Sequence, residues 1–126
     1  MEFNNNQAIY LQIADMVCEK ILLQQFRQDE RILSVREMAV QLEVNPNTVM
    51  RTYDFLQGLE IITNKRGIGY YVSADGIQKT TDFRRSAFLQ KEMPQFFKTA
   101  TLLNITIEEL KDQYLAYIQQ ALKNSI

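Results

Sequence analysis

The chain contains no histidine and a single cysteine, Cys18, among its 126 residues. A disulfide within the chain is therefore excluded, as are the usual zinc sites built from Cys and His and the hydrolytic triads that need His. Because Cys18 lies in an apolar helical stretch, we expect it to be a small buried hydrophobic residue. A Gly-rich phosphate loop and a clustered set of carboxylates are also missing, so the sequence predicts no enzyme, no metal site and no cofactor.

Long apolar runs are absent as well. No stretch approaches the roughly 18–20 residues that cross a bilayer, and residues 1–10 are polar, without the apolar core of a signal peptide. The contents of hydrophobic residues (46%) and charged residues (23%) are those of a soluble globular protein. We therefore expect a cytoplasmic protein with no membrane partner.

An excess of positive charge is the third thing missing, because the formal net charge is -1. Residues 1–78 hold 7 Lys/Arg against 10 Asp/Glu, and residues 79–126 hold 7 against 5. This balance disfavours a nonspecific coat on DNA, for which phosphate contacts supply the affinity. A sequence-specific reader needs its charges segregated by face. The basic face is expected to hold Arg31, Arg36, Arg51, Lys65 and Arg66, with Asp15, Glu19, Glu43 and Glu60 in other elements.

Cap chemistry between residues 34 and 57 predicts two short helices joined by a tight turn. Ser34-Val35-Arg36-Glu37 has the form of a capping box, in which the first and last side chains satisfy each other's backbone N–H groups. Asn45 is a favoured N-cap for the second helix, and Pro46 suits its first position because it lacks an N–H. Gly58 fits a left-handed position that would end this helix.

A 100° step per residue divides the helix from Pro46 to Gln57 into two sides. The inward side holds Val49, Tyr53 and Leu56. The outward side holds Asn47, Arg51 and Asp54, flanked by Thr48 and Met50.

A two-stranded ribbon is predicted next. Residues 60–63 and 70–72 have strand composition, and the tip between them contains Lys65, Arg66, Gly67 and Gly69, whose glycines permit positive φ. A helix, a tight turn, a second helix and a ribbon describe a winged helix-turn-helix, whose second helix fits the DNA major groove.

Helices flank this segment on both sides. An amphipathic helix is expected over residues 8–23, a linker over residues 73–81, and a helix over residues 82–103 that is kinked or broken at Pro94. A second capping box at Thr106 opens a helix to about Lys123. The expected fold is mainly α with a small β-hairpin, divided into a winged helix-turn-helix DNA-binding domain (residues 1–74) and a helical tail (residues 80–126).

The outward side chains fit the edges of base pairs. Arg grips guanine O6 and N7 together, Asn pairs similarly with adenine, and Thr suits a phosphate or a thymine methyl. We therefore assign these contacts to Arg51, Asn47 and Thr48, and expect Arg36 to reach the groove edge. Lys65 and Arg66, at the tip of the ribbon, would lie along an adjacent DNA minor groove or along the DNA backbone. The alternative is that these polar side chains are merely solvated, with Arg36 paired to Glu37 or Glu43 and with Lys65 and Arg66 as ordinary turn residues.

The stretches QAIYLQIADMVCEKI and LSVREMAVQLEVNPNTVMRTYDFLQGLEIITNKRGIGYYV resemble the GntR family of bacterial transcription regulators. The resemblance covers residues 7–72, and Asn45-Pro46-Asn47-Thr48-Val49 with Arg51-Thr52-Tyr53 is similar to the YtrA-like subfamily. It implies a dimeric repressor in which Arg36, Asn47, Thr48, Arg51 and the wing tip from Gly67 to Gly69 contact DNA. The chain departs from the family pattern at residues 28–30 and 33–34, and at Pro46 and Met50, where other members often carry Arg.

The tail contains more large apolar residues than so short a segment can bury alone. We expect it to pack on a second copy of the chain, as the resemblance implies, so that the homodimer reads a near-palindromic operator in double-stranded DNA. An effector pocket lined by Met and aromatic residues is a further alternative, although so few residues make a poor pocket. The alternative to DNA binding is a winged helix that serves as a protein-binding module.

Overall fold

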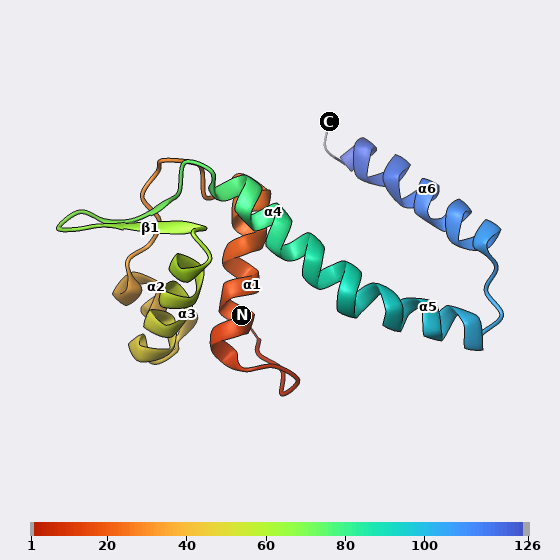
Figure 1. Ribbon diagram of the computed structural model, residues 1–126, viewed down its shortest axis with the longest axis horizontal. Helices are drawn as coiled ribbons and strands as arrows, with labels where there is room; N and C mark the ends of the chain where they lie inside the picture. Colours follow the sequence, from red (N-terminus) through yellow and green to blue (C-terminus); the bar gives the residue numbers. More distant parts are fainter. Residues whose placement is uncertain (1, 125–126) are drawn as a thin grey trace. The chain divides into compact units, whose positions relative to one another are not determined.

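The computed structural model describes residues 2–124, and the chain divides into two compact units between Arg85 and Ser86. We call the first the winged unit and the second the tail unit. Figure 1 follows the chain through both. None of the described helices is long and apolar enough to cross a membrane.

The fold is mainly α with a small β-hairpin, as predicted. The elements of the winged unit are α1 (Ile9–Leu22), α2 (Val35–Leu42), α3 (Pro46–Gly58), β1 (Ile62–Lys65), β2 (Gly69–Val72) and most of α4 (Gly76–Ala87). The tail unit continues with the π-helical segment η1 (Phe88–Glu92), α5 (Met93–Leu102) and α6 (Ile107–Asn124).

The core of the winged unit lies between α1, α2, α3 and the hairpin. Ile13, Val17 and Ile21 recur along one side of α1 and are fully buried, as are Tyr53 and Leu56 of α3. Cys18 is also buried, and burial raises the pKa of its thiol to about 12. The expectation that it is a small core residue is therefore confirmed.

The predicted start of α2 is confirmed. The Ser34 hydroxyl accepts a hydrogen bond from the Glu37 N–H (3.0 Å), and the Glu37 carboxylate accepts one from the Ser34 N–H (2.9 Å). The prediction for Gly58 is wrong, because Gly58 is the last helical residue of α3 and the left-handed position belongs to Glu60 (φ 63°). The helix runs one residue further than cap chemistry alone indicates.

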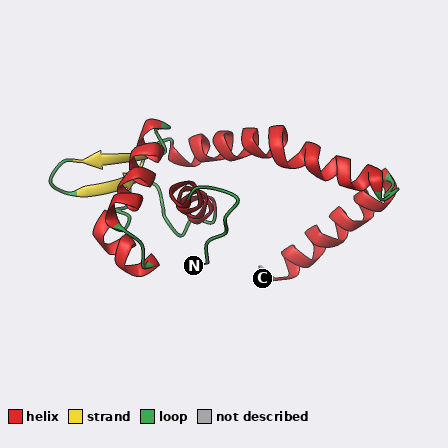
Figure 2. Cartoon of the chain, turned by 90° about the horizontal axis from the view of Figure 1, so that it is seen from below, coloured by secondary structure: helices red, strands yellow, loops and turns green. Residues whose placement is uncertain are grey.

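The hairpin pairs Ile62 with Val72 at its base and Lys65 with Gly69 near its tip. Figure 2 shows the two strands side by side, with the loop at their far end. The outer edge of β2 is also covered, because Arg31 bridges to its central part and the Ile32 N–H donates to the Tyr70 carbonyl (2.9 Å). The helices and the segment at residues 31–32 therefore support a ribbon that would be marginal alone.

The linker expected over residues 73–81 is wrong from residue 76 onward, because α4 begins at Gly76. A Cβ at Gly76 would lie 2.7 Å from both the Ile61 carbonyl oxygen and Val72 Cγ1, so only glycine allows this close approach. Thr80 is fully buried, and Arg84 of α4 forms an ion pair with Asp15 of α1 (2.9 Å). Residues 76–81, whose composition is typical of a linker, are therefore the start of a helix that packs on the rest of the winged unit.

In the tail unit, the predicted interruption around Pro94 takes the form of η1. A proline ring collides with the carbonyl four residues earlier, here Gln90, and the wider π-helical turn over Phe88–Glu92 contains that residue. α6 begins at Ile107 as predicted, and one of the two hydrogen bonds of the predicted capping box is present: the Thr106 hydroxyl accepts from the Glu109 N–H (3.2 Å). Ala100 is the only buried residue among those described in this unit.

Candidate nucleic-acid interface

The first turn of α3 is capped and faces solvent. The Asn45 side chain accepts a hydrogen bond from the Asn47 N–H (2.8 Å), and Pro46 occupies the first turn. Inward, Val49 and Tyr53 are fully buried, and the Tyr53 hydroxyl donates to the Leu33 carbonyl (2.6 Å). The helix therefore cannot rotate without losing its core contacts, and its outward residues are fixed in direction.

Three predicted site residues lie together on that outward side. Asn47 and Arg51 are exposed and Thr48 is half-buried, and all three line an open groove of about 380 Å³. The opposite side of the groove is formed by Ala8, Ile9 and Tyr10, where α1 begins. The surface is thus shared by two helices.

Tyr10 is the residue that sequence reasoning missed. The Arg51 guanidinium carbon lies 3.9 Å from the centre of the Tyr10 ring. Spacing along the chain gives no signal for this contact, because the two residues belong to helices far apart in sequence. Such a contact is found only once α1 and α3 are packed together.

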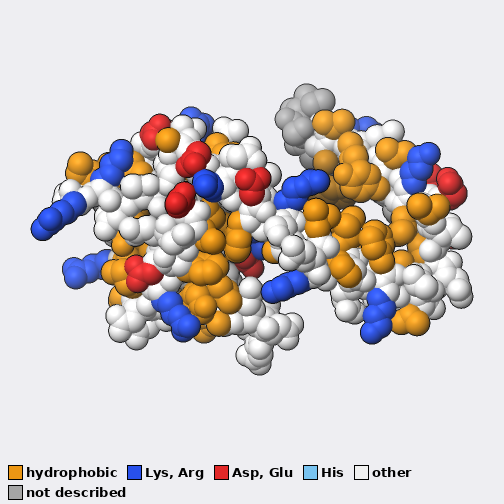
Figure 3. Space-filling view, in the orientation of Figure 1, with side chains coloured by type: hydrophobic (Ala, Val, Ile, Leu, Met, Phe, Trp, Pro, Cys, Tyr) orange, Lys and Arg blue, Asp and Glu red, His pale blue; other side chains and the backbone are white. Residues whose placement is uncertain are grey.

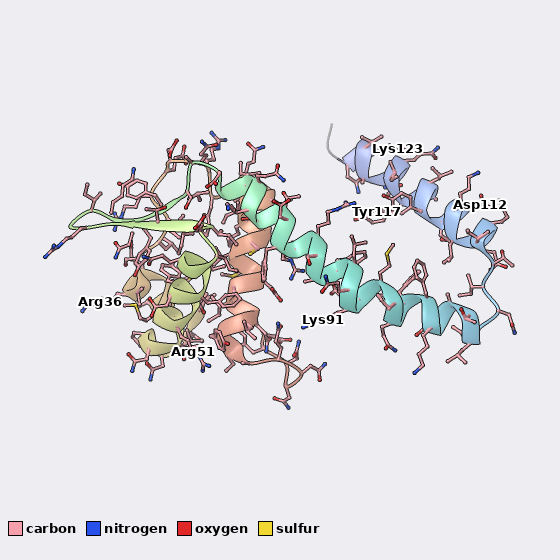
Figure 4. All side chains as sticks on the ribbon, viewed as in Figure 1. Arg36, Arg51, Lys91, Asp112, Tyr117 and Lys123 are labelled. Atoms are coloured by element: carbon pink, nitrogen blue, oxygen red, sulfur yellow. The ribbon has the colours of Figure 1, made fainter. Side chains whose placement is uncertain are left out.

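Arg36 lies apart from this group, on α2. Figure 4 shows Arg36 and Arg51 pointing outward from neighbouring helices of the winged unit. Arg36 is exposed and has no hydrogen bond or ion pair with the described part of the chain. The alternative pairing of Arg36 with Glu37 or Glu43 is not found in the described part of the chain, and Glu37 pairs with Arg31 instead (3.4 Å).

The hairpin of β1 and β2, which we call the wing, carries the remaining predicted residues. Gly67 (φ 79°) and Gly69 (φ 137°) have the positive φ expected of them. A Cβ on Gly69 would lie 3.0 Å from Arg31 Nε, so this glycine also makes room for the arginine side chain beside it. Lys65 lies over the Tyr71 ring (4.1 Å to its centre), and Arg66 is exposed at the tip.

The wing is also tied to α3. The Tyr53 and Tyr70 rings meet edge to face with centres 4.8 Å apart, and the Tyr70 hydroxyl donates to Met50 Sδ (3.9 Å). Burial, and then the negative charge of Asp54, raise the pKa of Tyr70. Hairpin and helix are therefore held together as one surface.

The segregation of charge is partly as expected. Asp15 and Glu60, which were expected in other elements, are paired with Arg84 and Lys79 of α4. Asp54 lies on α3, and Glu37 and Glu43 lie at the two ends of α2, which carries Arg36, so the expectation for Glu43 is wrong. The pKa of Glu37 is lowered by its hydrogen bonds from Ser34 and then by Arg31. In Figure 3, Lys and Arg side chains project from the left and lower edges of the winged unit, whereas most acidic ones lie above them.

Groups of His, Cys, Asp or Glu that would hold a metal ion are not found among residues 2–124. The chemistry of this surface is that of hydrogen-bond donors and positive charge around a helix N-terminus. Such a surface suits phosphates and base edges.

Comparison with known proteins agrees with this geometry. Residues 9–72 match the family model of the bacterial regulatory proteins, gntR family. The HTH-type transcriptional regulator YhcF of Bacillus subtilis is 32% identical over 109 residues (86% of this chain, 88% of that protein). The HTH-type transcriptional repressor YtrA of the same organism is 30% identical over 105 residues (82% of this chain, 79% of that protein).

A solved structure extends the similarity beyond the winged unit. The crystal structure of a GntR-family transcriptional regulator from Bacteroides thetaiotaomicron has 46% sequence identity to the chain and a TM-score of 0.72. The match covers 90% of this chain and 99% of the other.

Proposed function

Because the chain belongs to the GntR family and is a DNA-binding transcriptional regulator, we propose that it is a homodimeric repressor that reads a near-palindromic operator in the cytoplasm. One observation carries the proposal. The outward side of α3 presents amide, hydroxyl and guanidinium groups at its N-terminal end, while the opposite side is locked into the core.

The roles follow from the chemistry of base edges. Arg51 is proposed to read a guanine and Asn47 an adenine, with Thr48 on a phosphate or a thymine methyl. Arg36 would contact the DNA backbone at the edge of the major groove that receives α3. Free N–H groups and the positive end of the helix dipole at the start of α3 favour the approach of a phosphate.

The wing is proposed to lie against the neighbouring minor groove or backbone. Lys65 and Arg66 would supply positive charge there, and Gly67 and Gly69 would let the tip come close to the sugar-phosphate chain. These contacts add affinity without reading bases.

The tail is proposed to hold the two copies together. Large side chains are exposed on both of its α-helices, including Phe96 (54%), Leu102 (72%), Tyr114 (66%) and Tyr117 (72%), and Figure 3 shows apolar side chains crowded over this unit. So much exposed apolar surface is unusual on a monomer. A twofold dimer would present its two copies of α3 to successive major grooves, roughly 34 Å apart.

The test begins with selection of duplexes from a random library by the full-length protein. Arg51→Ala should weaken binding to the selected duplex by about 1–3 kcal/mol and relax the preference at particular base pairs. Lys65→Ala should weaken binding to all duplexes alike and reduce the salt slope by about one. Lys111→Ala, on the exposed surface of α6, is the matched control and should change neither.

If neither Arg51→Ala nor Lys65→Ala alters binding, the assigned roles are wrong.

The dimer is tested separately, by sedimentation equilibrium of the wild type and of Tyr114→Glu/Tyr117→Glu. Selected duplexes should contain two half-sites in inverted order, and the double variant should sediment as a monomer. A wild type that stays monomeric at the concentrations at which it binds a full site would contradict the dimer.

A further inference from the structure

Arg51 and Tyr10 are in contact, and both line the groove that the two helices share. From this contact we infer that Tyr10, in the first turn of α1, is a positioning residue for sequence recognition, because it holds Arg51 in the direction from which it meets a base. This inference rests on the proposed base-reading role of Arg51.

An arginine on an exposed helix normally samples many rotamers, and reading a base requires that it stop in one of them. Attraction between a guanidinium and the face of an aromatic ring selects orientations before DNA arrives. The separation of 3.9 Å is well inside the range over which this attraction acts. Tyr10 therefore reduces the entropy that Arg51 loses on binding.

A support of this kind must itself be rigid, and Tyr10 is held at two points by α3. Its backbone carbonyl accepts a hydrogen bond from the hydroxyl of Thr52 (2.8 Å), a fully buried residue. Its ring meets the Phe55 ring edge to face, with centres 6.1 Å apart. Arg51, Thr52 and Phe55 belong to the same helix, so the support and the reading group keep a constant relation.

The contact leaves the reading function of Arg51 intact. A guanidinium has five N–H donors, and Arg51 has no hydrogen bond or ion pair with any residue from 2 to 124. The groove beside it is open, with Asn47 and Thr48 on the same side. A base edge or a phosphate can therefore bind the free donors while the ring remains in contact.

The wing offers a matched case with a different expected outcome. Lys65 lies over Tyr71 much as Arg51 lies over Tyr10. However, an ammonium group acts on phosphates as a point charge. Removing Tyr71 should therefore alter affinity for all duplexes equally, whereas removing Tyr10 should alter the preference for one sequence.

The experiment uses the full-length protein, the duplex selected by the wild type and a scrambled duplex of the same length and composition. Dissociation constants are measured for the wild type, Tyr10→Phe, Tyr10→Leu, Arg51→Ala and the double variant Tyr10→Leu/Arg51→Ala, with Tyr71→Leu as the control. Tyr10→Leu should weaken binding to the selected duplex by roughly 5- to 30-fold and leave the scrambled duplex within about twofold. Tyr10→Phe, which keeps the ring face, should bind like the wild type.

The double variant separates positioning from a general loss of structure. If Tyr10 acts through Arg51, the double variant should bind the selected duplex no more weakly than Arg51→Ala alone. Equal losses from Tyr10→Leu with and without Arg51, or an equal loss on both duplexes, would overturn the inference. An Arg51→Ala variant with unchanged binding would instead overturn the proposed role of Arg51, and the inference with it.

Discussion

The winged unit and the tail unit use the same local chemistry and differ in what their side chains touch. Both begin a helix with a hydroxyl that accepts an N–H three residues later, at Ser34 and at Thr106. The winged unit then buries a continuous apolar core around α1 and α3. In the tail unit only Ala100 is buried among the described residues, and α6 contains no buried side chain.

This difference separates two kinds of information in one chain. Cap residues and amphipathic spacing determine where a helix begins and which of its sides is apolar. Most of the stability of a helix in a protein, however, comes from packing that apolar side against a partner. The winged unit contains its own partners, whereas the tail leaves its apolar sides exposed. The stability of the first should therefore be a property of one chain, and that of the second should depend on association.

Leu56→Ala is expected to have the largest effect. Leu56 is fully buried in α3, so the substitution removes apolar contacts and leaves a cavity, which should lower the free energy of unfolding by about 2–5 kcal/mol. Urea denaturation at several protein concentrations measures it. A loss that disappears on dilution would show that the core of the winged unit is not self-contained.

Tyr53→Phe should have a smaller effect on the same core. It removes the hydroxyl that donates to the Leu33 carbonyl (2.6 Å) but keeps the ring. Leaving that acceptor without its partner should cost about 1–3 kcal/mol. Tyr71→Phe on the wing is the matched control, because no hydrogen bond of its hydroxyl is found within residues 2–124. Equal losses from both variants would mean that the hydrogen bond contributes nothing specific.

The elements that the sequence predicts correctly are those encoded by residues close together in the chain. The capping box at Ser34, the Asn45 cap and the alternation of sides on α3 depend on neighbours within a few positions. The errors have the opposite origin. Gly76 looks like a linker residue, but contacts with Ile61 and Val72 make it part of a packed helix.

The candidate site divides in the same way. The outward placement of Asn47, Thr48 and Arg51 follows from helical spacing and is present in the structure. The support that Tyr10 gives to Arg51 depends on how α1 packs against α3, and no spacing rule contains that information. The arrangement of two copies is equally non-local, and it remains a proposal.

Ser34→Ala tests the local chemistry of the winged unit. Removing the cap should lower the free energy of unfolding by about 1 kcal/mol near neutral pH. In the folded protein, the hydrogen bond from the Ser34 N–H, which the variant keeps, and then the one from the Ser34 hydroxyl, which it loses, lower the pKa of Glu37. Their contribution is therefore complete above the unfolded pKa of glutamate, and it is lost as the pH falls through the lower folded value.

Urea denaturation from neutral to acid pH, for the wild type and the variant, measures this change. The difference between them should shrink as Glu37 becomes protonated, and Ser86→Ala at an exposed position of α4 should show no such loss. A difference that is constant with pH would indicate that the Ser34 hydroxyl does not stabilise the Glu37 carboxylate.

Leu102→Ala should have the smallest effect on the folding of a single chain, and it is the matched opposite of Leu56→Ala. Leu102 is 72% exposed, so at concentrations at which the chain is monomeric the substitution should change the free energy of unfolding by no more than about 0.5 kcal/mol. A loss should appear only at concentrations at which the wild type associates, because apolar contacts of the tail are then made between chains. Thermal unfolding across a dilution series, read beside sedimentation equilibrium, measures both. The same loss at every dilution would place Leu102 in a core within one chain, and the contrast between the two units would then be wrong.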